Sequence, residues 1–339
     1  MMLTAGQVKR RAMDLGADAV AIGPIERWEG APIQQDPRQI MPECRSVIAM
    51  AFRVMRGSLR GVEEGTFFSN YSSMGYGGLT YLYIPLTVIN LAKEIEDQGY
   101  EAIPYGHQSD WRAIDNVGRL KPRYSRPVAA GRAAPDVMVH LRIAAYLAGL
   151  GEIGFSKMFL TPQFGPRQRI GIVLTEAELE PDPLYEGPPL CNRCLACARD
   201  CPAQAFDPQK TVKVTLAGRE VEWMDLDGDA CDLAFRGAER DDSVVPEDGY
   251  LPHGGVGTRP GWWSPFCRKP RNLYTSGQAV CGARGCTRAC MISLEKRGVL
   301  RNRFHQPFRR RPTWRVDWAA EPEGRVTKTP PERTKGEAD

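Results

Sequence analysis

Four cysteines lie within eleven residues of the segment CNRCLACARDCP, at positions 191–202, and a proline follows the last of them. Their spacing is C-x2-C-x2-C-x3-C. Three cysteines two residues apart can hold three corners of a 4Fe–4S cube, while the fourth, set off by a longer step and a proline, ligates a second cluster. A tetrahedral zinc site usually draws on cysteine pairs instead. The motif therefore predicts iron–sulfur chemistry with two clusters.

The two clusters need four more ligands, and five cysteines follow the motif: Cys231, Cys267, Cys281, Cys286 and Cys290. By the crossing pattern of two-cluster ferredoxins, the first cube is expected to be held by Cys191, Cys194, Cys197 and Cys290. The second cube is expected to use Cys201, Cys281, Cys286 and either Cys231 or Cys267. The residues alone leave this last choice open.

The chain has 339 residues, enough to bury a core without disulfide support, so its ten cysteines are not required as staples. The N-terminus lacks the apolar region and cleavage site of a secretory signal, and no run reaches 18 apolar residues. We therefore expect a cytoplasmic protein with no transmembrane segment, in a reducing compartment where clustered cysteines serve metal or redox chemistry. Cys44 stands alone and is interpreted as a packed thiol.

The net charge of +4, from 45 basic and 41 acidic residues, does not indicate a nucleic-acid-binding protein as a whole. The segment 301–318, RNRFHQPFRRRPTWRVDW, is strongly basic and interleaved with aromatic residues. This pattern suits RNA or another acidic partner, and a solvated surface tail is the alternative. The residues after it are rich in Pro, Glu, Lys and Arg and are expected to be disordered.

Helices and short apolar strands alternate over the first 180 residues, which predicts an α/β (α+β) fold. Helices are expected over 4–15, 81–98 and 136–148, and strands over 17–23, 45–54, 100–104 and 168–176. Thr4 and Asp136 are the predicted caps, and Gly99 and Gly149 the predicted stops. Four prolines in 178–190 mark a predicted boundary. The predicted parts are 1–180, a cysteine-rich domain over 186–295, and a partly disordered basic tail over 296–339.

The segment YLAGLGEIGFSKMFLTPQFGPRQRIGIVLTE, ahead of the cysteine motif, resembles the superfamily of corrinoid-dependent reductive dehalogenases and epoxyqueuosine reductases. That superfamily carries an A-G-L-G-x-x-G segment, a strand ending in Thr and the first cluster motif in this order. LAKEIEDQGYEAIP and WMDLDGDACDLAF resemble two further family segments. The second of these carries a cluster ligand in the family, which favours Cys231 over Cys267. The resemblance covers roughly residues 1–295.

The resemblance implies a nitroreductase-like domain that binds cobalamin without a protein ligand to cobalt, followed by a ferredoxin-like domain with two 4Fe–4S clusters. It implies an external low-potential electron donor. The substrate would be a small organohalide or, in the other branch, the epoxide of a tRNA-borne queuosine precursor. Because the corrinoid carries the bond-breaking chemistry, the protein has to bind, orient and protonate.

The resemblance also points to candidate catalytic residues. Tyr76 and Tyr81 stand near the place where the dehalogenases have their proton-donating tyrosine, and Asp136 stands near the aspartate of the epoxyqueuosine reductases. His107 lies in a loop where the family places a polar active-site residue. At the position of Phe155 the family commonly has a basic residue. Lys157 stands two residues after that position and is the candidate to replace it. For each of these side chains, packing or helix capping is the alternative role.

Arg167 and Arg169 are candidates for binding corrinoid carboxamides or phosphate, with a solvated role as the alternative. We predict an oxidoreductase that depends on cobalamin and iron–sulfur clusters and is most similar to a reductive dehalogenase, because LTPQFGPRQR resembles the strand entry of those enzymes. One alternative is an epoxyqueuosine reductase-like tRNA-modification enzyme that uses the basic tail. Another is a non-catalytic two-cluster electron-transfer protein.

Overall fold

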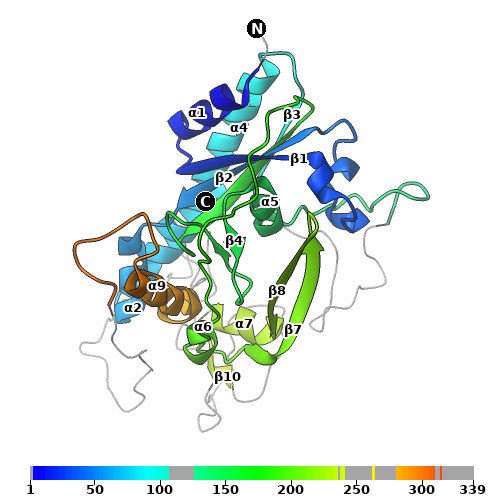
Figure 1. Ribbon diagram of the computed structural model, residues 1–339. Coiled ribbons are helices and arrows are strands. Elements are labelled where there is room, and N and C mark those ends of the chain that lie inside the picture. The colour runs from blue at the N-terminus through cyan, green and yellow to red at the C-terminus, as the bar shows by residue number, and fades with distance from the viewer. Residues whose placement is uncertain are drawn as a thin grey trace, which may run out of the picture.

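The computed structural model describes residues 3–106, 126–235, 237–240, 262–263, 280–309 and 314, which form a mixed helix and sheet structure (Figure 1). Its helices are α1 (Ala5–Asp14), α2 (Arg60–Glu64), α3 (Phe68–Asn70), α4 (Ile84–Glu96), α5 (Leu141–Ala148), α6 (Ala196–Arg199), α7 (Gly228–Phe235), α8 (Val280–Arg284) and α9 (Cys286–Arg297). A π-helix, η5 (Tyr71–Tyr83), precedes α4, and the 3-10 helices are η1 (Ile25–Trp28), η2 (Ile33–Gln35), η3 (Pro37–Gln39) and η4 (Arg56–Leu59). Its strands are β1 (Ala19–Pro24), β2 (Ser46–Arg53), β3 (Ala102–Tyr105), β4 (Glu152–Ile153), β5 (Phe159–Leu160), β6 (Gln168–Thr175), β7 (Phe206–Leu216), β8 (Arg219–Leu226), β9 (Glu239–Arg240) and β10 (Trp262–Trp263). None of the helices in these ranges is long and apolar enough to cross a membrane.

The main sheet has the strand order β1-β2-β6-β3, and every pairing in it is antiparallel. The four strands predicted from the first 180 residues are confirmed and make up this sheet. Helices do alternate with strands along the chain, but the antiparallel pairing makes the arrangement α+β rather than a parallel α/β sheet. Strand β2 lies inside the sheet with seven of its eight residues buried, which explains its continuous apolar sequence.

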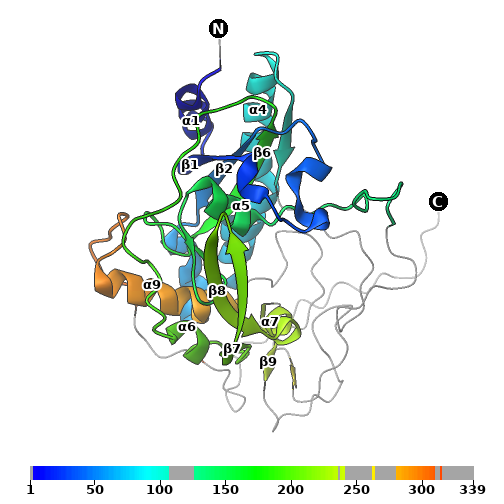
Figure 2. The ribbon, with the colours of Figure 1, turned by 45° about the vertical axis from the view of Figure 1, so that its right-hand side comes forward.

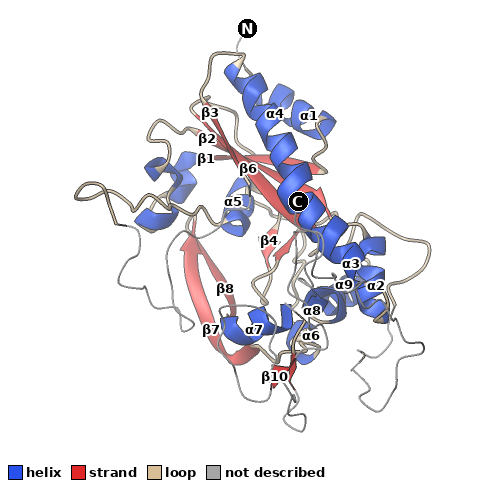
Figure 3. Ribbon diagram, turned by 180° about the vertical axis from the view of Figure 1, so that it is seen from behind, coloured by secondary structure: helices blue, strands red, loops and turns tan. Residues whose placement is uncertain are grey.

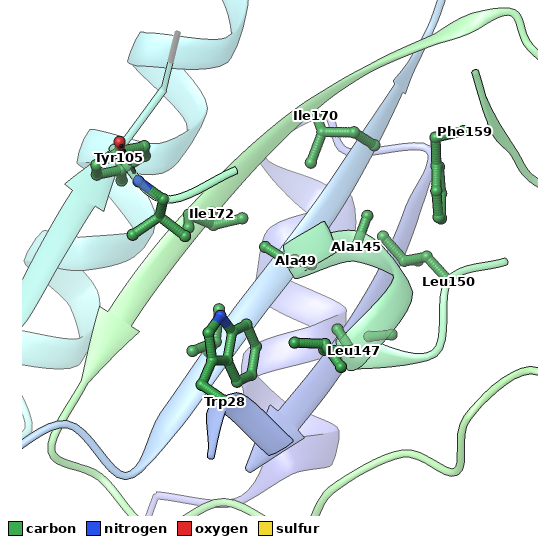
Figure 4. Packing of buried hydrophobic residues seen from close by; sticks show 14 of the residues in the cluster. Trp28, Ala49, Tyr105, Ala145, Leu147, Leu150, Phe159, Ile170 and Ile172 are labelled. Carbon is green, nitrogen blue, oxygen red and sulfur yellow. Dashed lines mark hydrogen bonds between the residues drawn. The ribbon is translucent and has the colours of Figure 1, made fainter. Parts of the chain in front are cut away.

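The side chains on the two faces of β2 pack in two separate hydrophobic clusters, because successive side chains of a strand point to opposite faces. Val47, Ala49 and Ala51 pack in the cluster under α5, which also holds Trp28 and Ile172 (Figure 4). The intervening residues Ile48, Met50 and Phe52 pack instead with residues of α1 and α4. Figure 3 shows α1 and α4 on one side of the sheet and α5 on the other.

Two predicted helix boundaries are confirmed and two differ. The helix predicted over 81–98 is α4, which begins at Ile84 and directly continues the π-helix η5. Thr4 caps α1 with a capping box, and Gly149 ends α5 with a φ of 95°. Helix α5, however, begins at Leu141 and not at Asp136. The prediction of Asp136 as the cap is wrong, because the His140 side chain accepts the hydrogen bond from the Ile143 backbone N–H at 3.4 Å.

The cysteine-rich half is connected to the sheet by the proline-rich segment 178–190 and by the β7–β8 hairpin. Sequence analysis did not predict this hairpin. Figure 2 shows it rising from α6 and α7 toward α5. Val221 and Trp223 of β8 join the hydrophobic cluster under α5. The hairpin therefore ties the segments that carry the cysteines to the face of the sheet that α5 covers.

The described part of the basic C-terminal segment contacts the protein through a few aromatic residues. Phe308 is 2% exposed, and the Arg56 guanidinium lies over the rings of Phe304 and Phe308 at 4.4 and 5.0 Å from their centroids. The Trp314 ring stacks on Phe68 with centroids 5.6 Å apart. Phe308 and Trp314 therefore anchor the segment, while residues 301 and 303–307 are exposed at the surface.

Gly149 is the position at which we expect a small substitution to have a large effect on stability. A Cβ there would come within 2.1 Å of the Pro183 carbonyl oxygen, in addition to the positive φ. Gly149→Ala should lower the unfolding free energy by about 3 kcal/mol, the sum of left-handed strain and a clash with backbone. Gly30→Ala is the matched control, because Gly30 has a φ of 78° but open space at its Cβ position, and should lose about 1 kcal/mol. Denaturant unfolding measures both, and equal losses would contradict the close approach to Pro183.

Candidate functional site

The cysteine motif forms a tight loop that ends in the short helix α6. Arg193 and Leu195, which flank Cys194, have φ values of 53° and 58°. Residues other than glycine rarely adopt this left-handed conformation, and such strain concentrates at ligand-binding and active sites. The loop is therefore shaped by something other than local backbone preference.

One cavity is lined by four cysteines, and they are those predicted for the first cube: Cys191, Cys194, Cys197 and Cys290. Cys290 reaches this cavity from α9, which packs beside α6 (Figure 1). The Phe155 backbone N–H donates to the Cys191 Sγ at 3.3 Å, and the Ser293 Oγ lies 3.5 Å from the Cys194 Sγ. Hydrogen bonds to ligand sulfur are one means by which a protein tunes an iron–sulfur cluster.

Two thiols of this first group are poor thiolates by themselves, whereas against the effect of burial the hydrogen bond with Ser293 helps to lower the pKa of Cys194. Burial raises the pKa of Cys197 and raises that of Cys290 well above the ordinary value, and the charge of Cys191 raises both further. Thiols that lie this close together in an apolar setting keep their protons unless a cation compensates their charge. A metal centre supplies that charge and deprotonates its ligands.

A second group holds the remaining cysteines that the structure describes in this half: Cys201, Cys231, Cys281 and Cys286. Three of them share one hydrophobic cluster with residues of α7. Burial raises the pKa of Cys231, raises that of Cys281 well above its ordinary value and raises that of Cys286 to about 12, and neighbouring thiols add to each effect. The described structure thus includes Cys231 in the group, whereas Cys267 lies outside the described residues.

The two groups adjoin through α9, which carries Cys286 and Cys290 one turn apart. Besides burial, the charge of Cys197 raises the pKa of Cys286, so a thiol of the second group lies near one of the first. Metal clusters held by the two groups would be neighbours. Within the described ranges, no three His, Cys, Asp or Glu side chains are placed to hold a single metal ion.

Tyr76 and Tyr81 lie together on the π-helix η5, with ring centroids 6.0 Å apart. The Arg169 guanidinium of β6 lies 4.4 Å from the Tyr76 ring centroid and donates to the Tyr71 hydroxyl oxygen at 3.2 Å. Burial raises the pKa of Tyr71, Arg169 partly offsets this, and the charge of Cys281 also acts on it. The tyrosines and Arg169 therefore lie beside the second cysteine group.

Lys157 follows the AGLGEIG loop with a φ of 62°. Its ammonium lies 5.4 Å from the Trp223 ring centroid, and Arg142 of α5 donates to its carbonyl oxygen at 2.9 Å. Burial lowers the pKa of Lys157, and the charge of Arg142 lowers it further. A lysine in this setting gives up its proton more readily than an exposed one.

Asp136 lies apart from the tyrosines. It is 8% exposed and accepts a hydrogen bond from the Gln34 side-chain amide at 3.0 Å. It lines a cavity together with Tyr105 and Met138, whereas Tyr76 belongs to a different hydrophobic cluster. The two kinds of predicted proton donor therefore occupy different surroundings.

The other two candidates do not join these groups. Arg167 is 1% exposed and donates to the Val54 carbonyl oxygen at 2.6 Å and to the Asn302 Oδ1 at 2.8 Å. Through Asn302 it holds the C-terminal segment. His107 lies outside the described residues.

Sequence analysis missed Tyr71, Arg142 and Ser293. The signal for Tyr71 is its five-residue spacing from Tyr76 and of Tyr76 from Tyr81, which matches the i to i+5 hydrogen-bond repeat of a π-helix. Arg142 and Ser293 carry no such signal, because only the folded chain brings them to Lys157 and Cys194.

Comparisons with known proteins find reductases of two kinds. No family model matches the chain. A tetrachloroethene reductive dehalogenase of Desulfitobacterium hafniense is 47% identical over 72 residues, which cover 21% of this chain and 13% of the relative. An epoxyqueuosine reductase of Gloeobacter violaceus is 26% identical over 231 residues, which cover 61% of this chain and 62% of the relative. A solved catabolic reductive dehalogenase aligns with a TM-score of 0.46 and 21% identity over 66% of this chain and 28% of its own.

The predicted resemblance to this superfamily is confirmed, since sequence relatives from both of its branches match. The matched part of the chain spans about an eighth of the dehalogenase and somewhat under two thirds of the epoxyqueuosine reductase. The named activities of those relatives come to this chain only as a proposal.

His140, the cap of α5, gives a pH-dependent test of the buried cationic surroundings. Burial, reinforced by the charges of Arg142 and Lys157, lowers its pKa to about 4. An unfolded histidine binds its proton near pH 6.5. Between these values the unfolded chain therefore binds more protons than the folded protein, so stability falls as the pH falls.

We expect this one residue to remove about 2 kcal/mol of unfolding free energy between pH 7 and pH 5. His140→Asn keeps a side chain that can cap the helix and has no proton to bind, so its loss over the same interval should be smaller by that amount. Denaturant unfolding at the two pH values measures the difference. An equal loss in both proteins would mean that His140 is charged in the folded state.

Proposed function

We propose that this chain is an oxidoreductase in which two 4Fe–4S clusters pass electrons to a bound cobalamin, with a reaction most similar to reductive dehalogenation. The observation that carries the proposal is that the two cysteine groups adjoin through α9 and lie beside a group of tyrosine and basic side chains. Thiolate sulfur is the donor that these clusters take, so both donor sets fit. In these terms the sheet half is the nitroreductase-like domain and the cysteine half the ferredoxin-like domain.

The residues between the sheet and the second cysteine group suit a corrinoid. Arg169 and Lys157 offer cationic N–H donors, and Arg142 lies close enough to Cys231 and Cys286 for their charges to interact. Carboxamide oxygens and a phosphate are the groups that such donors bind well. A reduced corrinoid bound there would supply the nucleophile or electron donor that breaks the substrate bond.

The proton would come from Tyr76, with Tyr81 packed against it. A phenol that gives up its proton becomes an anion, and a guanidinium 4.4 Å from the ring lowers the free energy of that anion. Lys157, with its lowered pKa, is suited to return a proton after turnover. These residues bind, orient and protonate, while the external electron donor and the cofactors supply the electrons.

A cytoplasmic location belongs to the same proposal. Every cysteine in the described ranges is a free thiol, as a reducing compartment favours. The substrate class proposed is a small organohalide.

An epoxyqueuosine reductase-like activity on tRNA is the second candidate, favoured by the longer match to such an enzyme. Asp136 would then be the proton donor. Arg309, from the basic segment, pairs with the buried Glu63, whereas Arg301 and Arg303 are exposed and free to contact tRNA. A non-catalytic electron-transfer protein is the third candidate, and bound cobalt separates it from both enzymes.

The iron content of cysteine variants tests the second cluster. Cys231→Ser should remove about half of the iron from anaerobically prepared protein, because it deletes one of four ligands of one cluster. Cys267→Ser should keep it. Cys44→Ser is the matched control, since Cys44 is buried away from both groups and donates to the Ser46 carbonyl oxygen at 3.6 Å. Full iron in Cys231→Ser would contradict the assignment of this ligand, and iron-loaded protein that binds no cobalamin would contradict the reductase.

The two enzyme candidates differ in their proton donor. With a chemical reductant and a panel of aryl and vinyl bromides, Tyr76→Phe should lower the rate of bromide release about a hundredfold, and Asp136→Asn should change it little. If the second candidate is right, then on a stem-loop RNA that carries the epoxide Asp136→Asn should lose activity and Tyr76→Phe should lose little. Loss of bromide release in Asp136→Asn with full activity in Tyr76→Phe would contradict the assignment of the donor.

A further inference from the structure

The two cysteine groups differ in their access to solvent. Cys194 is exposed, whereas every other cysteine in the described ranges is buried or partly buried. In the second group Cys201 is buried, and Cys231, Cys281 and Cys286 are partly buried. A cluster in the first group would therefore come closest to the surface at Cys194.

The motif loop and the end of α9 contribute four basic residues on the side of Cys194: Arg193, Arg199, Lys296 and Arg297. Arg199 donates to the Cys194 carbonyl oxygen at 2.9 Å. Lys296 and Arg297 follow Ser293, the residue that contacts the Cys194 sulfur, by three and four positions and so lie on the same side of α9. The charges of Arg199 and Arg297 both act on Cys194. We call this surface the Cys194 rim.

The acidic side chains near the rim leave it positive. Glu222 pairs with Arg193 at 2.8 Å. Asp200 lies 3.7 Å from Arg288, a buried residue of α9. Glu295 is 16% exposed and faces Arg56 at 3.3 Å, within the packed C-terminal segment.

Glu152 is directed inward as well, because its carboxylate accepts the Cys191 backbone N–H. Burial raises its pKa. The charge of Arg297 acts on Glu152, and its guanidinium donates to the Pro189 and Leu190 carbonyl oxygens. With Glu222 offsetting Arg193, the exposed charges of Arg199 and Lys296 remain.

We propose that the Cys194 rim is the docking surface for the electron donor and that this donor is an acidic one-electron carrier protein of the flavodoxin or ferredoxin type. The inference rests on the proposed function, since it needs a cluster in the first cysteine group. In each encounter the reduced carrier loses one electron and the cluster gains it, and no bond or proton has to move. A positive rim raises the encounter rate with an acidic carrier and orients its cofactor toward Cys194.

The test uses iron-loaded full chain and pre-reduced, acidic flavodoxin, with appearance of the flavodoxin semiquinone absorbance as the readout in a stopped-flow experiment. Arg199→Glu combined with Lys296→Glu should lower the second-order rate constant about tenfold or more at low salt. Arg10→Glu combined with Lys93→Glu is the matched control, because these exposed residues lie on α1 and α4 at the opposite end of the molecule (Figure 1) and should leave the rate unchanged. The rate for the unaltered chain should fall as salt is added.

Reduction by dithionite needs no protein docking, so it distinguishes failure of the docking surface from failure of the proposed function. Normal dithionite reduction together with an unchanged flavodoxin rate in the rim variant overturns the docking surface and leaves the proposed function standing. A chain without iron, or with iron that dithionite does not reduce, overturns the proposed function and the docking surface with it. If the rim variant loses iron, the salt dependence of the unaltered chain decides, and a rate that does not fall with salt overturns the proposal.

Discussion

The buried carboxylate of Glu63 fixes the helix on which both cysteine groups depend. Its side chain is 3% exposed and pairs with Arg288 of α9 and with Arg309 of the C-terminal segment. Removing one member of such a set leaves an uncompensated buried charge, at a cost of about 3–5 kcal/mol. Arg288 is two residues from both Cys286 and Cys290 and so points away from the face they share. The ion set therefore fixes the rotation of α9 and, with it, the direction of one ligand for each group.

The glycine-rich loop after α5 has a comparable effect on the first group. A Cβ on Gly151 would lie 2.0 Å from the Leu160 carbonyl oxygen, so only glycine lets the two backbones approach this closely. The loop then places the Phe155 N–H on the Cys191 sulfur and the Glu152 carboxylate on the Cys191 N–H. The AGLGEIG segment and the cysteine motif are thus two sides of one structural unit, which gives a physical reason for their occurrence together.

Much of the fold follows from local sequence. Strand β2 is a continuous apolar run because both of its faces are buried, and Thr4 and Gly149 mark helix ends through a capping hydrogen bond and a positive φ. The start of α5 could not be predicted in this way. Asp136 is the stronger cap by residue type, but residues 136–140 form no helix, and the Gln34 amide donates to the Asp136 carboxylate in a separate contact.

In the candidate site, too, some residues are predicted by local sequence and others are brought together only by the fold. The spacing of the cysteine motif is a local property and predicts its cluster type, and the grouping of Cys290 with the motif follows from the ferredoxin pattern. Arg142, by contrast, reaches Lys157 only because α5 packs on the sheet beside the β7–β8 hairpin, and the charge of Glu63 is useful only next to Arg288 and Arg309. Contacts between residues far apart in the sequence have no local signature, so they become visible only in the folded chain.

The order of the groups in space suggests a direction for electron flow. Cys194 of the first group is exposed, whereas Cys197, Cys290, Cys281 and Cys286 are partly buried and Cys201 of the second group is buried. Beyond these lies Tyr71, whose hydroxyl contacts Arg169. A negative charge that moves along this series passes from water into the protein interior. Arg199 and Arg297 lie near it at the outer end, and Arg142 and Arg169 lie near it at the inner end. If the proposed clusters are bound, positive side chains at both ends would offset the cost of adding an electron to them, and the inner pair lies where the proposed substrate reaction would use it.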